Sequence, residues 1–361
     1  MADDLKRDPF KEYLREKEPG RKDRGYAWYT AIGLQAVDGL KTSKYLQETA
    51  VKNIEGQISI EDAERLINSY YEEKADDSDP DRTKEADQVS LRIARILSEK
   101  SFSFTPNEYI SIHRKLFTGI YSHAGKIRDY NITKKEWVLD GKTVIYGSAS
   151  ELRATLEYDF SEERKFSYKN LSMDEIIQHL AFFVSRLWQI HIFGEGNTRT
   201  TAVFFIRYLR TLGFDVTNDI FAENAWYFRN AMVRANYNDL QHGIHETTEY
   251  LELFLRNLLL GESNELKNQY MHIRWKSEKQ DIESTKQDIE IPVTLSNKTK
   301  QHIRQLFGKY GFGTFFGRTE VMEELHLTAS PASALIKKML ELELIYPLRG
   351  KGKGKYLFKR M

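Results

Sequence analysis

A short polar turn between two apolar helical runs constrains the fold of this chain more than any other feature. Residues 191–202 read His-Ile-Phe-Gly-Glu-Gly-Asn-Thr-Arg-Thr-Thr-Ala, after an apolar run at 176–190 and before a second at 202–212. The apolar periodicity predicts two packed helices joined at this turn. A turn that opens a helix directs free backbone N–H groups and the positive end of the helix dipole at one point, which makes an anion site.

Three side chains of this turn fit chemistry on a nucleotide polyphosphate. Arg199 offers a forked donor suited to phosphate oxygens. Glu195 is suited to Mg²⁺, which prefers few protein carboxylates together with phosphate oxygens. His191 can take a proton near neutral pH. A single His at a helix end is more often structural, but here it stands beside an anion site and a carboxylate.

The stretch resembles the signature of the Fic family, His-x-Phe-x-Asp/Glu-Gly-Asn-Gly/Lys-Arg-x-x-Arg. Two positions depart from it, because Thr198 replaces Gly or Lys and Ala202 replaces the second Arg. The resemblance implies a mainly α fold, a Fic-type helical bundle with a β-hairpin flap. The matching positions are His191, Phe193, Glu195, Gly196, Asn197 and Arg199.

The resemblance also implies a protein adenylyltransferase, which transfers AMP from ATP to a Tyr, Ser or Thr hydroxyl of a protein target. His191 is then the general base and Glu195 the ligand of Mg²⁺, with ATP as co-substrate. Phe193 is expected to point into the core and fix the loop. The expected nucleotide-binding residues of the signature are Gly196, Asn197, Thr198 and Arg199.

A flap and a nucleoside end are expected outside the signature. Two β-prone runs around Asp140-Gly141, at 137–146, predict a β-hairpin, and the alternative is a plain connecting hairpin. The resemblance implies that the flap pins the target by strand addition. At the nucleoside end it implies that Phe228 stacks on adenine and that Asn236 lies nearby, with Arg229 as a departure. The flap residues expected to border the nucleotide are Val144, Ile145, Tyr146 and Gly147.

A segment at about 41–56 resembles the inhibitory helix of many Fic proteins and ends in Glu55-Gly56. The resemblance implies an inhibitory Glu55. Its family partner is the second Arg of the signature, which is Ala202 here, and Val51 replaces the usual Ser or Thr. Either another basic residue meets Glu55 or its carboxylate faces water, because a buried unpaired carboxylate is costly.

The length of 361 residues predicts more than one domain. We expect an N-terminal helical region at 1–100, a Fic core domain at 101–260, a linker at 261–294 and a further domain at 295–361. Within the core domain, helices are predicted at 150–158 and 173–190, the second capped by Ser172. Its aromatic residues Phe182, Phe183 and Trp188 are expected in the core.

The C-terminal segment is basic. Residues 295–361 hold thirteen Lys or Arg and five Asp or Glu, a net charge of +8, while the whole chain carries +1. Three predicted helices followed by a β-ribbon with a lysine-rich tip resemble a winged helix-turn-helix domain. Lys337, Lys338 and the ribbon lysines would suit DNA phosphates. The alternative is a protein-interaction domain with a solvated basic face.

Composition limits the remaining classes. The chain has no cysteine, which excludes disulfides, thiolate zinc sites and a cysteine nucleophile and fits a cytoplasmic location. The charged N-terminus predicts no signal peptide, and the lack of a long apolar run predicts no membrane span. Fic proteins often form dimers, so a homodimer is an expectation from the resemblance alone.

Four functions remain open at this stage. The first is AMP transfer to a protein hydroxyl. The others are transfer of another phosphate-linked group, removal of AMP from a modified target, and a nucleotide-responsive DNA-binding regulator with a Fic body.

Overall fold

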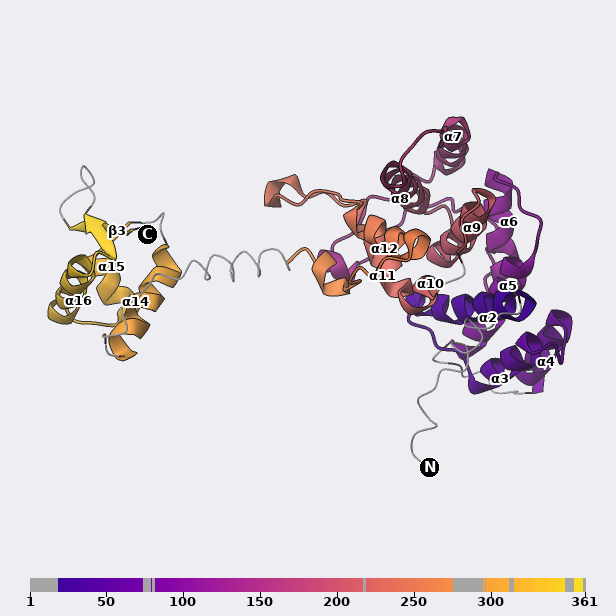
Figure 1. Ribbon diagram of the computed structural model, residues 1–361, viewed down its shortest axis with the longest axis horizontal. Helices are drawn as coiled ribbons and strands as arrows, with labels where there is room; N and C mark the ends of the chain where they lie inside the picture. Colours follow the sequence, from indigo (N-terminus) through magenta and orange to yellow (C-terminus); the bar gives the residue numbers. More distant parts are fainter. Residues whose placement is uncertain are drawn as a thin grey trace, which may run out of the picture. The chain divides into compact units, whose positions relative to one another are not determined.

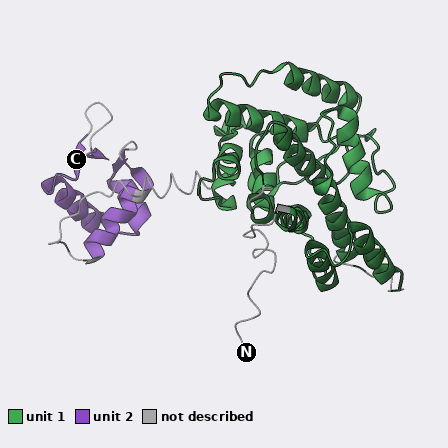
Figure 2. Cartoon of the chain, turned by 45° about the vertical axis from the view of Figure 1, so that its right-hand side comes forward, with its two compact units in different colours: residues 1–275 green, residues 276–361 purple. Residues whose placement is uncertain are grey.

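The chain forms two compact units, Met1–Trp275 and Lys276–Met361, in a computed structural model (Figure 2). The structure describes residues 19–73, 79, 82–216, 219–274, 295, 297–311, 315–347 and 354–359. The short helix that the sequence suggests at 10–17 and the lysine-rich tip at 350–353 lie outside these residues. The boundary between the units falls within the segment predicted as a linker.

Unit 1 is built of helices, which confirms the mainly α prediction (Figure 1). Its long helices, in chain order, are α2 (Pro19–Gly33), α3 (Lys44–Ile54), α4 (Ile60–Glu73), α5 (Thr83–Ser98), α6 (Pro106–Phe117), α7 (Leu152–Lys165), α8 (Met173–Ile190), α9 (Asn197–Thr211), α11 (Ala225–Arg234) and α12 (Glu249–Leu260). Short pieces are the helix α10 (Ile220–Glu223) and the 3₁₀ turns η2 (Leu34–Asp38), η3 (Trp137–Leu139), η4 (Leu240–His242) and η5 (Asn268–Met271).

Local sequence signals set where the helices near the turn begin and end. Ser172 and Glu175 form a full capping box at the start of α8, as predicted. Pro106 stands at the first position of α6, and the side chain of Thr105 caps that helix. Helix α8 ends at His191, whose left-handed φ of 50° stops the helix. The catalytic candidate is therefore also the residue that terminates α8.

Helix α9 lies at the centre of unit 1 and packs against α5, α6 and α8 (Figure 1). Every residue from Asn197 to Leu209 is buried, on all faces of the helix. A helix buried all round is held by its neighbours rather than by an amphipathic stripe. Phe204 of α9 packs against a ring cluster that includes Phe104, Tyr109 and Phe160. The position of the α9 N-terminus is therefore set by the core.

The predicted flap is present as a loop, and its prediction as a β-hairpin is wrong. Asp140 and Gly141 have positive φ values of 54° and 78°, as an Asp-Gly turn requires. The preceding run forms the 3₁₀ turn η3 because Val138 and Leu139 are both fully buried. In a hairpin strand with one face on the core, adjacent side chains point to opposite faces, so one of these two would be exposed. Residues 143–147 belong to no strand of the described chain.

Three further expectations need correction. Helix α7 extends to Lys165, beyond the predicted end at Tyr158. Phe182 is 58% exposed, while Phe183 and Trp188 are buried as expected. Residues 261–274, predicted as linker, are part of unit 1: Met271 is buried and the Ile273 N–H donates to the Val138 carbonyl.

A cavity of about 540 Å³ lies between α7 and α8. Phe182 lines it together with Tyr158 and Arg186.

Unit 2 has its own core and combines helices with a small sheet. Its helices are α14 (Asn297–Tyr310), α15 (Arg318–Leu325) and α16 (Ala329–Glu341). Its antiparallel sheet has the order β1-β3-β2, from β1 (Phe316–Gly317), β2 (Ile345–Pro347) and β3 (Lys355–Phe358). Several described lysines form ion pairs, as in Lys309–Glu324 and Lys355–Glu320. The winged-helix assignment and DNA binding stay predictions.

No described helix is both long and apolar enough to cross a membrane.

Candidate active site

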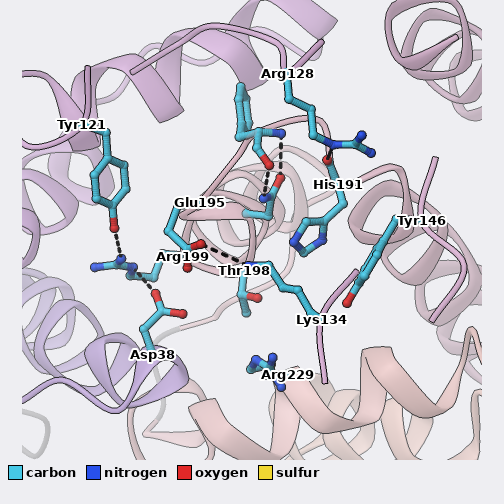
Figure 3. A network of polar contacts seen from close by, with 12 residues as sticks. Asp38, Tyr121, Arg128, Lys134, Tyr146, His191, Glu195, Thr198, Arg199 and Arg229 are labelled. Atoms are coloured by element: carbon cyan, nitrogen blue, oxygen red, sulfur yellow. Dashed lines mark hydrogen bonds and ion pairs between the residues drawn. The ribbon is translucent and has the colours of Figure 1, made fainter. Parts of the chain in front are cut away.

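His191 is buried at the end of α8, and its imidazole points toward a space bordered by Tyr146 and Lys134 (Figure 3). Among the residues that the structure describes, neither ring nitrogen has a hydrogen-bond partner. Burial lowers the pKa of His191 well below its usual value, and the positive charges of Lys134, Arg229 and Arg128 lower it further. The ring is therefore neutral at pH 7 and able to accept a proton.

The turn after His191 is held rigid by side chains that the signature places there. The Asn197 side chain accepts from the Phe193 N–H and donates to the Phe193 carbonyl, at 3.0 and 2.8 Å. Phe193 is fully buried, as expected. The side chain of Asn197, predicted to bind the nucleotide, thus fixes the turn between Phe193 and Asn197 instead. We assign it a positioning role.

His113 supports the same turn from α6, a role that no sequence pattern indicated. Its ring stacks face to face on Phe193 at 3.7 Å between centroids. Its Nδ1 accepts from the Gly125 N–H at 2.8 Å, and its Nε2 lies 3.0 Å from the Glu195 carbonyl oxygen. An N–H donor on one side and a carbonyl on the other together require the neutral Nε2–H tautomer.

The N-terminus of α9 offers backbone donors to an anion. The first N–H groups of a helix have no intrahelical partner, and no side chain of the described residues caps this end. Gly196 has φ of +74°, and an added Cβ would lie 2.4 Å from the Phe117 ring. Only glycine therefore fits at this position. Thr198, predicted to bind the nucleotide, accepts a hydrogen bond from Trp188 Nε1 through its hydroxyl, so its hydroxyl O–H and its backbone N–H are the donors that remain for a ligand.

Arg199 is fully buried, and its guanidinium binds other residues of the protein. This corrects its predicted role as a hydrogen-bond donor to phosphate oxygens. It forms ion pairs with Asp38 at 2.8 Å (Figure 3) and with Glu85 at 2.7 Å. It also donates to Gln35 and Tyr121. Burial alone would lower the pKa of Arg199, but the two carboxylates outweigh it and raise the pKa. The signature arginine thus ties α9 to the N-terminal segment.

Two cations face the site, Lys134 from the loop before the flap and Arg229 from α11. Lys134 Nζ lies 3.2 Å from Oε2 of Glu195, the predicted metal ligand (Figure 3). Arg229 forms two hydrogen bonds with the buried Glu136, at 2.7 and 3.1 Å. Glu136 also accepts from the Tyr146 hydroxyl at 2.9 Å. The partner of Arg229, which the sequence left open, is therefore the flap carboxylate.

Arg128 clamps the segments around His191 together. Its guanidinium donates to the carbonyls of His191 at 2.7 Å, Gly147 at 2.6 Å and Tyr130 at 2.5 Å. No carboxylate among the described residues pairs with it, and burial lowers its pKa. One side chain thus joins residues 128–130, the flap and the end of α8.

The flap residues divide between the core and the surface. Val144 and Tyr146 are buried, and the Tyr146 ring lies 4.4 Å from that of His191. Ile145 is 84% exposed. Gln189 of α8 binds the flap backbone, donating to the Ile145 carbonyl and accepting from the Gly147 N–H. Tyr146 and Gly147 thus border the site, and Ile145 faces outward.

Three predicted site residues lie elsewhere. Phe228 is fully buried against Phe221 and Phe254, so its ring is not available for adenine. Asn236 is buried and its amide donates to the carbonyls of Ser185 and Met232, a structural contact. Glu55 is exposed at the end of α3, where it accepts from Gln57. The carboxylates that do hold the signature arginine are those of Asp38 and Glu85.

We expect the stability of unit 1 to fall as the pH drops from 7 to 5. Burial lowers the pKa of His113 to about 3, while the unfolded residue titrates near 6.5. Below pH 6.5 the unfolded chain binds a proton that the folded chain does not bind, so stability is lost with falling pH. For His113 the loss at pH 5 is about 2 kcal/mol.

Urea unfolding followed by tryptophan fluorescence measures this effect, since all five tryptophans lie in unit 1. The variant His113→Gln should be less stable at pH 7 but should show a shallower loss toward pH 5. The exposed His242 provides the matched control, and His242→Gln should keep the wild-type pH dependence. An unchanged pH dependence in His113→Gln would show that His113 is not the neutral group described above.

Comparison with known proteins agrees with this geometry. Residues 103–209 match the model of the Fic/DOC family. The chain carries a Fic domain. The Fic domain begins just before α6 and ends within α9, so it contains His113, the flap and the turn at His191. The segment from α2 to α5 precedes it and supplies Asp38, from η2, and Glu85, from α5, to Arg199.

Two similar proteins have been described. Protein adenylyltransferase VbhT from Bartonella schoenbuchensis is 30% identical over 108 residues, which is 30% of this chain and 21% of the relative. The match therefore spans about a fifth of that relative's length. The crystal structure of a Fic family protein from Desulfovibrio desulfuricans G20 is 12% identical, with a TM-score of 0.39, and the likeness covers 97% of this chain and 90% of that chain.

Proposed function

We propose that the Fic domain is a protein adenylyltransferase that uses ATP. The observation that carries the proposal is the buried, neutral His191, with both ring nitrogens unpartnered among the described residues, next to the uncapped N-terminus of α9. A base beside an anion site is the arrangement that hydroxyl attack on a phosphate requires. The partial match to a protein adenylyltransferase supports AMP as the transferred group.

The reaction follows from this arrangement. His191 takes the proton of a target hydroxyl, and the hydroxyl oxygen attacks the α-phosphorus of ATP. A new oxygen–phosphorus bond forms as the bond from the α-phosphorus to the oxygen bridging to the β-phosphate breaks. Pyrophosphate leaves with that electron pair, and the proton stays on His191. The backbone N–H groups that open α9 hold the phosphates in place.

The donor set fits a magnesium ion that is bound together with the nucleotide. Glu195 is half-exposed at the turn, and no cluster of three or more His, Asp or Glu suited to a metal occurs among the described residues. A single carboxylate that shares the ion with phosphate oxygens is the arrangement that Mg²⁺ prefers. Bound there, Mg²⁺ would neutralise phosphate charge.

Calorimetry with ATP and Mg²⁺ tests the nucleotide site separately from the chemistry. We expect wild-type protein to bind ATP, and Gly196→Ala to weaken binding by at least tenfold, because the added methyl group displaces the α9 N-terminus from Phe117. Gly243→Ala, at a positive φ in an open turn, is the matched control and should bind ATP like wild type. Wild-type protein that binds no ATP at millimolar concentration would contradict the proposal.

A further inference from the structure

The signature of this chain presents no arginine side chain to a polyphosphate. Arg199 is fully buried and paired with Asp38 and Glu85. Ala202, where the signature has its second arginine, is fully buried and apolar. A bound nucleoside triphosphate brings several negative charges, which need cations nearby. Those cations must come from outside the signature.

Three cationic side chains lie near His191, namely Arg128, Arg229 and Lys134. They differ in how freely each can move. Arg128 donates to several backbone carbonyls and is buried. Arg229 is held at two points by Glu136, which is itself fully buried. The ammonium of Lys134 contacts only the Glu195 carboxylate among described residues, and the side chains of this pair are 28% and 37% exposed. Of the three, Lys134 is the one that can be redirected at low cost.

We propose that Lys134 is the cation that binds the nucleotide's polyphosphate in place of the missing second arginine, and that it rests on Glu195 until a metal ion takes this carboxylate. The inference rests on the proposed function. Without nucleotide, Lys134 then competes with the free metal ion for Glu195. With nucleotide, it binds the β- and γ-phosphates.

The energetics favour such an exchange. A partly exposed ion pair contributes little to stability, so breaking the contact between Lys134 and Glu195 costs little. A divalent cation on Glu195 repels the ammonium, while phosphate oxygens nearby attract it. The flexible four-carbon stem of lysine allows the ammonium to turn from the carboxylate to a phosphate. Arg128 and Arg229 meanwhile stay in place and hold the flap.

The test compares Lys134→Met, which keeps the stem and removes the charge, with Lys135→Met. Lys135 is the exposed neighbour on the same loop and serves as the matched control. With Mg²⁺ present, Lys134→Met should weaken ATP binding on the order of tenfold and AMP binding less than about twofold, since AMP lacks the β- and γ-phosphates. Lys134→Arg should keep most of the ATP affinity. Lys135→Met should match wild type for both nucleotides.

A second measurement uses Mn²⁺ alone, followed by electron paramagnetic resonance. Without nucleotide, Lys134→Met should bind Mn²⁺ more tightly than wild type, and Glu195→Gln should abolish the difference. The inference is overturned if Lys134→Met weakens ATP and AMP equally, if it leaves ATP binding unchanged, or if it does not tighten Mn²⁺ binding. If one of these results is found and wild-type protein still transfers AMP, the inference fails but the proposed function stands. Wild-type protein without ATP affinity would overturn both.

Discussion

Replacing His191 by Asn should lower the transfer rate by about 10²–10⁴-fold, the usual contribution of a general base. Asn is the matched choice because it tolerates the left-handed backbone at this position, where φ is 50°. Neither ring nitrogen has a hydrogen-bond partner among the described residues, so the substitution should leave the fold intact. The affinity for ATP should change less than about threefold, because in the proposed site the α9 backbone and Lys134, not His191, hold the phosphates.

The pH dependence of the rate gives an independent test of the same residue. Because burial and the positive charges of Lys134 and Arg229 lower the pKa of His191, the base stays neutral as the pH falls below 6.5. We therefore expect the His191-dependent rate to stay nearly constant between pH 8 and 6. A rate that falls about fourfold between pH 8 and 6 would show that His191 titrates with the ordinary pKa near 6.5, contrary to its buried position. His242→Asn, on the surface, should change neither rate nor profile.

Replacing Arg199 by Leu should destabilise unit 1 by about 3–5 kcal/mol. The substitution removes the guanidinium that pairs with the Asp38 and Glu85 carboxylates; among the described residues Asp38 then has no paired cation, and Glu85 keeps only the partly exposed Arg82. A buried carboxylate without its cation is strongly unfavourable. Urea unfolding followed by tryptophan fluorescence measures the loss. Arg153→Leu, which breaks an exposed pair with Glu157 on α7, should cost less than about 0.5 kcal/mol.

A double replacement separates charge from packing at Arg199. If unpaired charge is the cause, adding Glu85→Gln to Arg199→Leu should recover at least about 1 kcal/mol. A loss below about 1 kcal/mol in Arg199→Leu alone would instead show that water reaches the carboxylates. The wild-type network is central to the site because it anchors α9, whose N-terminus is the proposed phosphate site.

The sequence predicted the parts of the site that depend on neighbouring residues. Helix α8, its cap at Ser172 and the turn at His191 follow from apolar periodicity and local hydrogen bonding. The Asp140-Gly141 pair likewise predicted a turn, and both residues have the positive φ values that such a turn requires. The flap strands were not, because Val138 and Leu139 are both buried by residues distant in the chain, and this contact outweighs their β propensity.

The roles of polar residues could be predicted only where both partners lie within the signature. Asn197 and Phe193 are four residues apart, yet Arg199 pairs with Glu85, which lies 114 residues away. In the sequence, His113 occupies a position on the apolar face of α6 that has no distinguishing pattern. Only the fold brings it to Glu195 and Gly125. Lys134 and Glu136 lie in a loop without a helical or strand pattern. Their meeting with Glu195 and Arg229 depends on tertiary structure.

The most direct test of the central claim is transfer of labelled α-phosphate from ATP to protein. Wild-type protein, His191→Asn and His242→Asn would be incubated with Mg²⁺, labelled ATP and a mixture of candidate target proteins, and bound label would be located by mass spectrometry. The account predicts one adenylyl group on a Tyr, Ser or Thr hydroxyl with wild type and His242→Asn, and loss of this label with His191→Asn. Equal labelling by His191→Asn, or no labelling by wild-type protein that binds ATP, would contradict it.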